Sequence, residues 1–252
     1  MKKFLLEIEY FGKNFKGWQI QKNQRTVQDE IQKALKKLLE KDIEVVGSGR
    51  TDSGVHAYHQ KAHFEAETSI PAENFVDALN NLLDYDVKIK SCIDVDNNFH
   101  ARYDVTKKTY LYKLFVSDIP SPLKSDFTLF VPYDINVRAM KKACSYIKGT
   151  HDFTSFCSAD CEIENKVRTI YKIKIKKYGF DELHIFITGN GFLTNMVRII
   201  VGTLIDVGRG KIKASKVKEI INSKDRTKAG KTVAPQGLYL YDVEYKHKVR
   251  LI

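Results

Sequence analysis

The stretch 47–60, GSGRTDSGVHAYHQ, places a carboxylate, an arginine and two histidines among three glycines. Residues 43–46 before it are apolar and rich in β-branched side chains, and residues 58–67 after it alternate in polarity, as strands do. The glycines permit positive φ and close approach of another backbone. The pattern predicts a stiff loop that presents Asp52 at the end of a strand. A plain tight turn, in which Asp52 bonds only its own backbone, is the commoner structure for such a pattern.

Arg198 is a second candidate, because it lies inside residues 192–207, the most apolar helical stretch of the chain. An arginine on or beside a buried stripe is costly unless a carboxylate or a phosphate meets it. Its position therefore indicates a negatively charged partner. A structural pair, or a side chain that reaches out to solvent, would satisfy the same pattern.

Charge is unevenly distributed along the chain. The formal net charge is +11, and residues 106–252 carry 27 basic against 14 acidic side chains, whereas residues 1–105 are slightly acidic. Tyr110 and Tyr112 alternate along a strand-like run of the basic part. Basic side chains with aromatic rings between them suit a polyanion that carries bases, since rings stack on unpaired bases. A solvated lysine face has the same composition, so composition alone leaves both interpretations open.

Several kinds of site and location are disfavoured. The four cysteines are too few and scattered for a disulfide framework, and they lack the spacing of a zinc site. His56 faces away from His59 and His63 on a strand, so we expect surface polar residues rather than a metal site. The sequence shows no apolar run of transmembrane length, no signal peptide and no glycine-rich phosphate loop before a helix. We expect a cytoplasmic protein with no membrane contact, metal or nucleotide cofactor.

Periodicity predicts the elements that position these residues. In the first part we expect strands at 3–10, 43–46, 58–67 and 87–93 and helices at 26–39 and 72–83. Thr26 is expected to cap the first helix, which has acidic side chains in its first turn and lysines toward its end.

The second part repeats this order after a connector at 94–104. Strands are expected at 109–116, 167–176, 183–188 and 238–245, and helices at 135–147 and 193–207. No residue-level repeat accompanies the repeated order. The pattern predicts an α+β protein with two similar halves, 1–105 and 106–252, whose sheets pack side by side.

The stretch GRTDSGVHA resembles the active-site signature of the tRNA pseudouridine synthase A family, whose members modify the anticodon arm of tRNA. Other resembling blocks cover nearly the whole chain: FKGWQIQ, FHARYDVTKKTYLYKL, HDFTSFC, VRTIY, FLTNMVRIIVGTLIDVG and APQGLYL. One departure is Tyr10-Phe11-Gly12, where the family often has Tyr-Asp-Gly. It affects the expected RNA contacts of the adjoining loop and leaves the catalytic assignment unchanged.

The resemblance implies both a fold and a site. Two related halves would share a continuous mixed, mainly antiparallel sheet, with helices on one side and a catalytic cleft between the halves. Asp52 would be the nucleophile, Arg198 would pair with it, and Tyr110 would stack on the target uracil and could accept a proton from its ring. Val55 and Leu238 would line the same apolar pocket, which has to exclude water.

Other residues expected to contact substrate are mostly basic. Arg50 would help to hold the nucleotide out of its helix, which costs a few kcal/mol. Residues 223–231, SKDRTKAGK, suit phosphate contact, although a mobile solvated loop would have the same composition. The expected substrate-binding set is Lys13, Lys16, Arg50, Val55, His56, Arg168, Lys224, Arg226, Lys228, Lys231 and Leu238.

A single carboxylate could break the glycosidic bond of uridine, because the leaving nitrogen delocalises its charge over the uracil ring. Asp52 could attack C1′ covalently or assist elimination to a glycal, and the sequence does not separate these routes. The resemblance implies uridines 38, 39 and 40 of the tRNA anticodon stem and loop as substrates, no cofactor, and a homodimer. The alternatives are a non-catalytic RNA-binding protein of the same fold and a synthase with other target positions.

Overall fold

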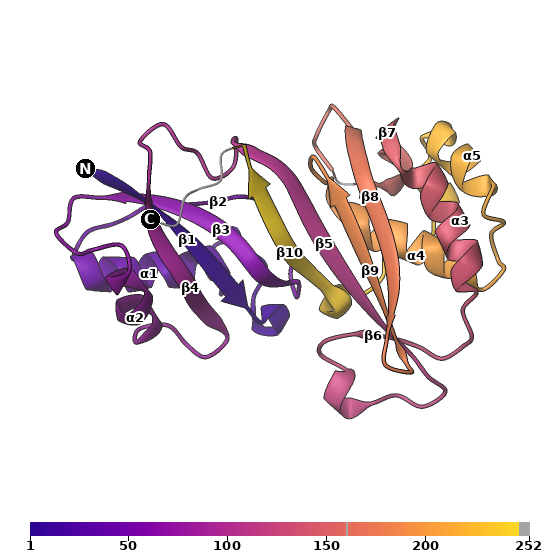
Figure 1. Ribbon diagram of the computed structural model, residues 1–252, viewed down its shortest axis with the longest axis horizontal. Coiled ribbons are helices and arrows are strands. Elements are labelled where there is room, and N and C mark those ends of the chain that lie inside the picture. Colours follow the sequence, from indigo (N-terminus) through magenta and orange to yellow (C-terminus); the bar gives the residue numbers. More distant parts are fainter. Residues whose placement is uncertain (160, 247–252) are drawn as a thin grey trace. The chain divides into compact units, whose positions relative to one another are not determined.

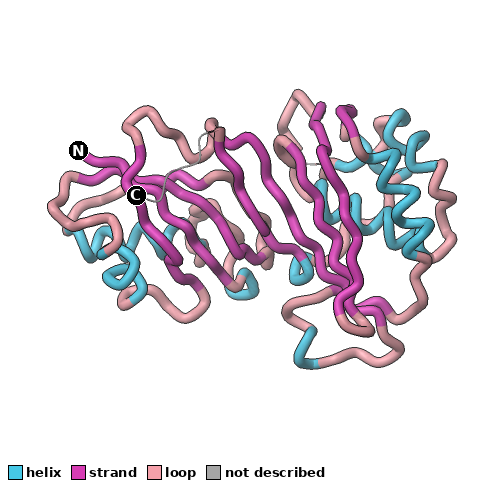
Figure 2. The backbone as a smooth tube through the Cα atoms, in the orientation of Figure 1, coloured by secondary structure: helices cyan, strands magenta, loops and turns pink. Residues whose placement is uncertain are grey.

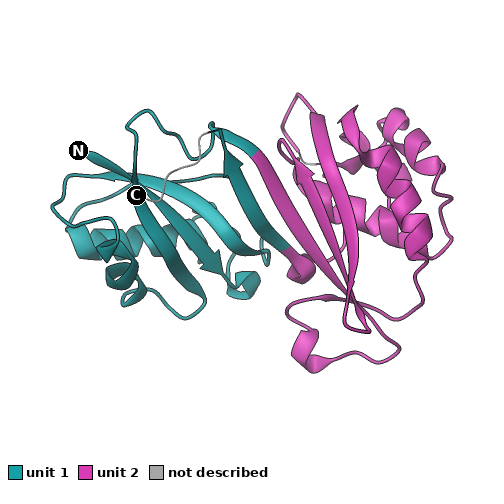
Figure 3. Ribbon diagram, viewed as in Figure 1, with its two compact units in different colours: residues 1–106, 239–252 teal, residues 107–238 magenta. Residues whose placement is uncertain are grey.

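The computed structural model describes residues 1–159 and 161–246 (Figure 1). Within these ranges the chain forms ten strands and five α-helices, and the strands pair mainly antiparallel. The predicted α+β class is therefore confirmed. The chain divides into two compact units: residues 1–106 with 239–246 form unit 1, and residues 107–238 form unit 2 (Figure 3).

Unit 1 is built around the central pair of strands β1 and β3. Its elements are β1 (Lys2–Tyr10), α1 (Val27–Leu39), β2 (Val45–Gly47), β3 (His56–Ala66), α2 (Asn74–Asn80), β4 (Val87–Val95) and β10 (Leu238–Tyr245). The strand order is β4-β1-β3-β10. On its other edge β3 pairs with β10 in parallel at His56 and Ala57, and with β2 antiparallel at residues 62–64.

The core of unit 1 follows from the alternation along β1. Phe4, Leu6 and Ile8 are completely buried. The Phe4 ring lies 5.0 Å from the ring of Phe64 on β3 and 5.0 Å from that of Phe75 on α2. Helix α2 therefore covers the sheet face to which these side chains point, and α1 lies on the same side (Figure 1).

The N-terminus of α1 is capped differently from the prediction. Thr26 is the N-cap residue, but its side chain makes no capping hydrogen bond, and its buried Oγ1 has no partner among the described residues. The amides of Val27 and Gln28 instead donate to the carbonyls of Gly17 and Trp18, at 3.2 and 3.1 Å. The preceding loop thus satisfies the first helical donors, and the prediction of a threonine cap was wrong.

Unit 2 combines its own run of strands with three helices. Its elements are β5 (Val105–Val116), which begins in unit 1, β6 (Leu129–Val131), α3 (Val137–Ile147), β7 (Gly149–Asp152), β8 (Val167–Tyr178), β9 (Glu182–Gly189), α4 (Met196–Gly208) and α5 (Lys216–Ser223). The strand order is β5-β9-β8-β7, and β6 runs parallel to β5. Helix α3 packs against α4 and α5, and Figure 2 shows these helices clustered together.

The expected strands and helices are present, with ends shifted by a few residues. Three short elements, β6, β7 and α5, were not predicted. The unit boundary differs from the expected halves in one respect, because residues 239–246 group with unit 1. The reason is the parallel pairing of Tyr239 and Leu240 with β3, a contact between distant segments that local pattern does not encode.

None of the described helices is long and apolar enough to cross a membrane.

Candidate active site

The Asp52 loop is held by the loop at residues 11–18. The Trp18 amide donates to the Thr51 carbonyl at 3.1 Å, and the Gly54 amide donates to the Phe15 carbonyl at 3.3 Å. At the base of the loop, the hydroxyls of Thr51 and Tyr10 are 2.7 Å apart and buried. The segment that carries the half-buried Asp52 is therefore fixed on both sides by backbone contacts.

Glycines permit this close packing. A Cβ on Gly17, whose φ is +92°, would lie 2.5 Å from the Thr51 carbonyl oxygen, and a Cβ on Gly12 would lie 2.1 Å from that of Val55. Within the loop, the Val55 amide donates to the Asp52 carbonyl at 3.2 Å. The local turn and the stiff presenting loop, which the sequence left as alternatives, are thus the same structure.

His56 lies beneath this loop. It is 2% exposed, its Nδ1 accepts the Gly12 amide at 3.0 Å, and its ring stacks between those of Phe11 and Tyr239, with centroids 5.2 and 4.7 Å away. The neighbouring His63 is also buried. The expectation of surface histidines was wrong for both, because their Nδ1 atoms serve as acceptors for buried backbone amides.

The three histidines have separate partners. His59 contacts Glu7, whereas His63 accepts the Ala101 amide at 3.1 Å. Among the described residues, no group of three or more His, Cys, Asp or Glu side chains is arranged to hold a metal ion.

Arg198 is anchored within unit 2. Its Nε donates to the Val233 carbonyl at 2.7 Å, and its Nη1 donates to Oδ1 of Asn195 at 2.6 Å. Asn195 precedes α4 in the left-handed conformation, with φ of 60°. These bonds orient a half-buried guanidinium at the start of the most apolar helix.

The tyrosines of β5 share one face of the strand. Tyr110 is 9% exposed, and its ring meets that of Phe192 edge-on, with centroids 5.1 Å apart. Tyr112 is fully buried, and its hydroxyl donates to the Ala234 carbonyl at 2.5 Å. Its ring packs on Gly237, where a Cβ would lie 2.7 Å from a ring carbon. Burial raises the pKa of Tyr112 well above its usual range, although the positive charge of Arg198 opposes the shift.

The segment 233–238 therefore joins two parts of the candidate site. Val233 accepts from Arg198 on α4, and Ala234 accepts from Tyr112 on β5. Leu238, which follows, is 4% exposed. This segment, which includes the APQGL stretch, connects α4 with β5 within unit 2, a role that its sequence did not predict.

The basic residues of the expected substrate-binding set differ in their exposure and contacts. The exposed ones are Lys13, Lys16, Arg50, Lys224, Lys228 and Lys231.

Three residues of this set make side-chain contacts within the fold. Lys224 forms an ion pair with Asp152 at 2.9 Å. Arg226 donates to the Gly230 carbonyl and the Thr232 hydroxyl, both at 3.0 Å, and Arg168 donates to the Val167 carbonyl at 2.7 Å. Arg226 thus holds its own loop together, whereas Lys224 connects that loop to β7.

The loop at 223–231 is fastened to α4. The Gly230 amide donates to the Thr203 hydroxyl at 2.9 Å, and a Cβ on Gly202 would lie 2.0 Å from the Lys231 carbonyl oxygen. A loop held this closely presents Lys228 and Lys231 from a fixed backbone, which disfavours the mobile interpretation, and phosphate contact stays a prediction.

The predicted catalytic residues and the two predicted pocket residues, Val55 and Leu238, are divided between the units. Asp52 and Val55 lie in unit 1, whereas Tyr110, Arg198 and Leu238 lie in unit 2. The pairing of Asp52 with Arg198, and the stacking role of Tyr110, stay predictions. The sequence analysis did not predict four residues that support the site, namely Phe15, Trp18, Val233 and Ala234. The glycines of FKGW and APQGL could have indicated them, because these glycines permit close approach of another segment.

A model of the tRNA pseudouridine synthase family matches residues 7–104 and 143–246. The tRNA pseudouridine synthase A of Caldicellulosiruptor bescii is 46% identical over 245 residues, which cover 97% of this chain and 100% of that protein. The protein of the same name in Ruminiclostridium cellulolyticum is 48% identical, with the same coverage. That of Bacillus subtilis is 48% identical over 240 residues, covering 94% of this chain and 97% of the relative.

Proposed function

The chain belongs to the tRNA pseudouridine synthase family, and we propose that it isomerises uridine to pseudouridine in tRNA. The family expected from the sequence motifs is thereby confirmed. The observation that carries the proposal is the extent of the similarity, 46–48% identity over 94–97% of the chain. Asp52 and Arg198 lie inside the ranges that the family model matches, and Tyr110 lies between those ranges.

The proposed substrates are uridines 38, 39 and 40 of the anticodon stem and loop. Asp52 acts as the nucleophile at the ribose or as the base that assists glycal formation. The bond between N1 and C1′ breaks, the uracil rotates, and a bond between C5 and C1′ forms. C5 loses its proton and N1 takes up one, so that the product is an isomer of the substrate. Arg198 keeps Asp52 ionised, and the reaction requires no cofactor. The rigid support of the Asp52 loop favours this role, because a reacting carboxylate has to be held in position.

Release of tritium from C5-labelled uridine in an unmodified tRNA transcript tests the proposal. We expect release by the wild type, mapping to positions 38–40, and none by Asp52→Asn, while tRNA affinity stays close to that of the wild type. The substitution removes a charge at the reacting centre and none from the exposed lysines that face phosphate. Binding without release by the wild type would favour the non-catalytic alternative, and release that maps elsewhere would favour other target positions.

We further propose a homodimer in the cytoplasm that binds tRNA across both subunits, as the sequence resemblance implies. Light scattering at micromolar concentration measures the first point, and a mass near that of one chain would remove the dimer. Cell fractionation measures the second.

A further inference from the structure

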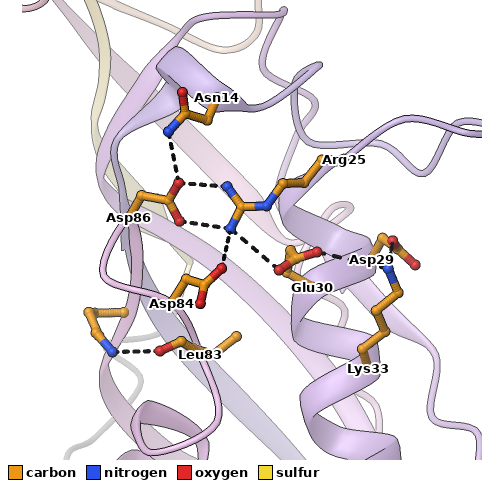
Figure 4. Close-up of polar contacts among 9 residues, drawn as sticks. Asn14, Arg25, Asp29, Glu30, Lys33, Leu83, Asp84 and Asp86 are labelled. Carbon is orange, nitrogen blue, oxygen red and sulfur yellow. Dashed lines mark hydrogen bonds and ion pairs between the residues drawn. The ribbon is translucent and has the colours of Figure 1, made fainter.

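Arg25 lies at the centre of a cluster of polar side chains in unit 1 (Figure 4). Its guanidinium forms a fork with Asp86, in which Nη1 meets Oδ2 at 2.6 Å and Nη2 meets Oδ1 at 2.9 Å. Nη2 also lies 3.0 Å from Asp84 and 3.4 Å from Glu30. Asn14 donates to Oδ2 of Asp86 at 3.3 Å, the same oxygen that Arg25 Nη1 meets. A bidentate arginine pair fixes direction as well as distance.

The same two residues hold the loop at 11–18 through their main chains. The Lys16 amide donates to the Arg25 carbonyl at 2.9 Å, and the Phe11 amide donates to the Asp86 carbonyl at 2.9 Å. The Arg25 guanidinium also stands 4.4 Å above the ring of Phe15, within cation–π range. The loop is thus attached to the main chains of these two residues at its start and near its end, and to the Arg25 side chain at its middle.

Phe15 connects the loop at 11–18, which Arg25 and Asp86 hold, to the Asp52 loop. Its carbonyl accepts the Gly54 amide at 3.3 Å and the Ser53 hydroxyl at 3.4 Å, and its side chain is 2% exposed. Both donors follow Asp52 directly in the chain. A displacement of Phe15 therefore moves the segment that carries the carboxylate.

The electrostatic environment keeps the fork in place. The Asp86 side chain is 1% exposed, whereas that of Arg25 is 30% exposed. Burial disfavours the charge of Asp86, but hydrogen bonds from Arg25 and Asn14 outweigh this effect and hold the pKa of Asp86 below its usual range. A lysine at position 25 would keep a charge but could not form the planar fork.

We propose that Arg25, held by its ion pair with Asp86, is a positioning residue. Through Phe15 it fixes the position of the Asp52 loop. The inference rests on the proposed function for its catalytic consequence. Its mechanical part, that Arg25 holds the loop at 11–18, does not depend on that function.

Trp18 provides a readout of the loop that is independent of activity. It is the single tryptophan of the chain, it is 2% exposed, and it lies in this loop. Its emission and its quenching by acrylamide therefore report on loop position directly. The rate constant for tritium release in a single turnover at saturating tRNA reports on the placement of Asp52.

The main variant is the double substitution Arg25→Gln with Asp86→Asn, which leaves no unpaired buried carboxylate behind. We expect acrylamide to quench Trp18 at least twofold more strongly than in the wild type. We expect the single-turnover rate to fall by at least tenfold, and the Kd for tRNA to change by a smaller factor, because a misplacement of about 1 Å can cost about a hundredfold in rate. Arg25→Lys should give intermediate values. All rates are measured well below the melting temperature of each variant, so that a loss of stability does not enter.

Lys36→Gln is the matched control, since it removes an exposed ion pair of the same unit, with Asp42, without touching the loop. Quenching and rate should both stay at the wild-type level. Unchanged Trp18 quenching in the double variant would overturn the anchoring role of Arg25. Stronger quenching with an unchanged rate would overturn the link to Asp52. A wild type that releases no tritium would refute the proposed function instead, while the quenching result would still decide the anchoring role.

Discussion

Replacing Gly17 with alanine tests how tightly the Asp52 loop has to be held. The new Cβ would lie 2.5 Å from the Thr51 carbonyl oxygen, whereas ordinary contacts begin near 3.4 Å. Because the obstacle is backbone, Thr51 or the loop at 11–18 has to move by the difference, about 0.9 Å. The positive φ of Gly17, +92°, adds strain of about 1–2 kcal/mol.

A displacement of this size, one residue from Asp52, should lower the single-turnover rate of tritium release by about ten- to a hundredfold. The tRNA Kd should change much less, since the exposed lysines remain. Stopped single-turnover reactions at saturating protein give the rate, and filter binding gives the Kd.

Gly210→Ala is the control, because Gly210 has a similar φ of +76° but nothing within 4 Å of the new Cβ. It should lose a comparable amount of stability from strain and keep the wild-type rate. If Gly17→Ala also kept the wild-type rate, close packing against Thr51 would not be what places Asp52.

The remaining predictions concern pH, stability and RNA binding. Burial lowers the pKa of His63 to about 4, below the value of about 6.5 in an unfolded chain, so the folded state favours the neutral ring. This contribution to the free energy of unfolding is therefore complete above pH 6.5 and is lost between pH 6.5 and 4, by at most about 3 kcal/mol. Urea unfolding of His63→Gln should lack this pH-dependent fall. An equal fall in the variant would assign it to other groups. Tyr112→Phe leaves the Ala234 carbonyl without its donor and should cost about 1–2 kcal/mol in urea unfolding, whereas wild-type stability would show that water replaces the hydroxyl. Neutralising Lys228 and Lys231 should weaken tRNA binding and reduce the slope of log Kd against log salt by up to about 1.8, and an unchanged slope would mean that neither meets phosphate.

The sequence by itself determined the main elements and the family. Alternation at 3–10 gave β1, and the apolar stripe after Thr26 gave α1, because both patterns depend only on neighbouring residues. The stretch around Asp52 was readable as a glycine-rich turn between two strands for the same reason. Its motifs also indicated the family that the comparisons confirm.

Tertiary structure decided which distant segments meet. The parallel pairing of β10 with β3, the supply of helix-capping carbonyls by Gly17 and Trp18, and the burial of His56 under Gly12 all join residues far apart in the chain or on different elements. Arg226, which is expected to contact phosphate, also donates to the Gly230 carbonyl of its own loop. Local propensity cannot encode such contacts, because the free energy that selects them comes from burial and hydrogen bonding between segments that only the complete fold brings together.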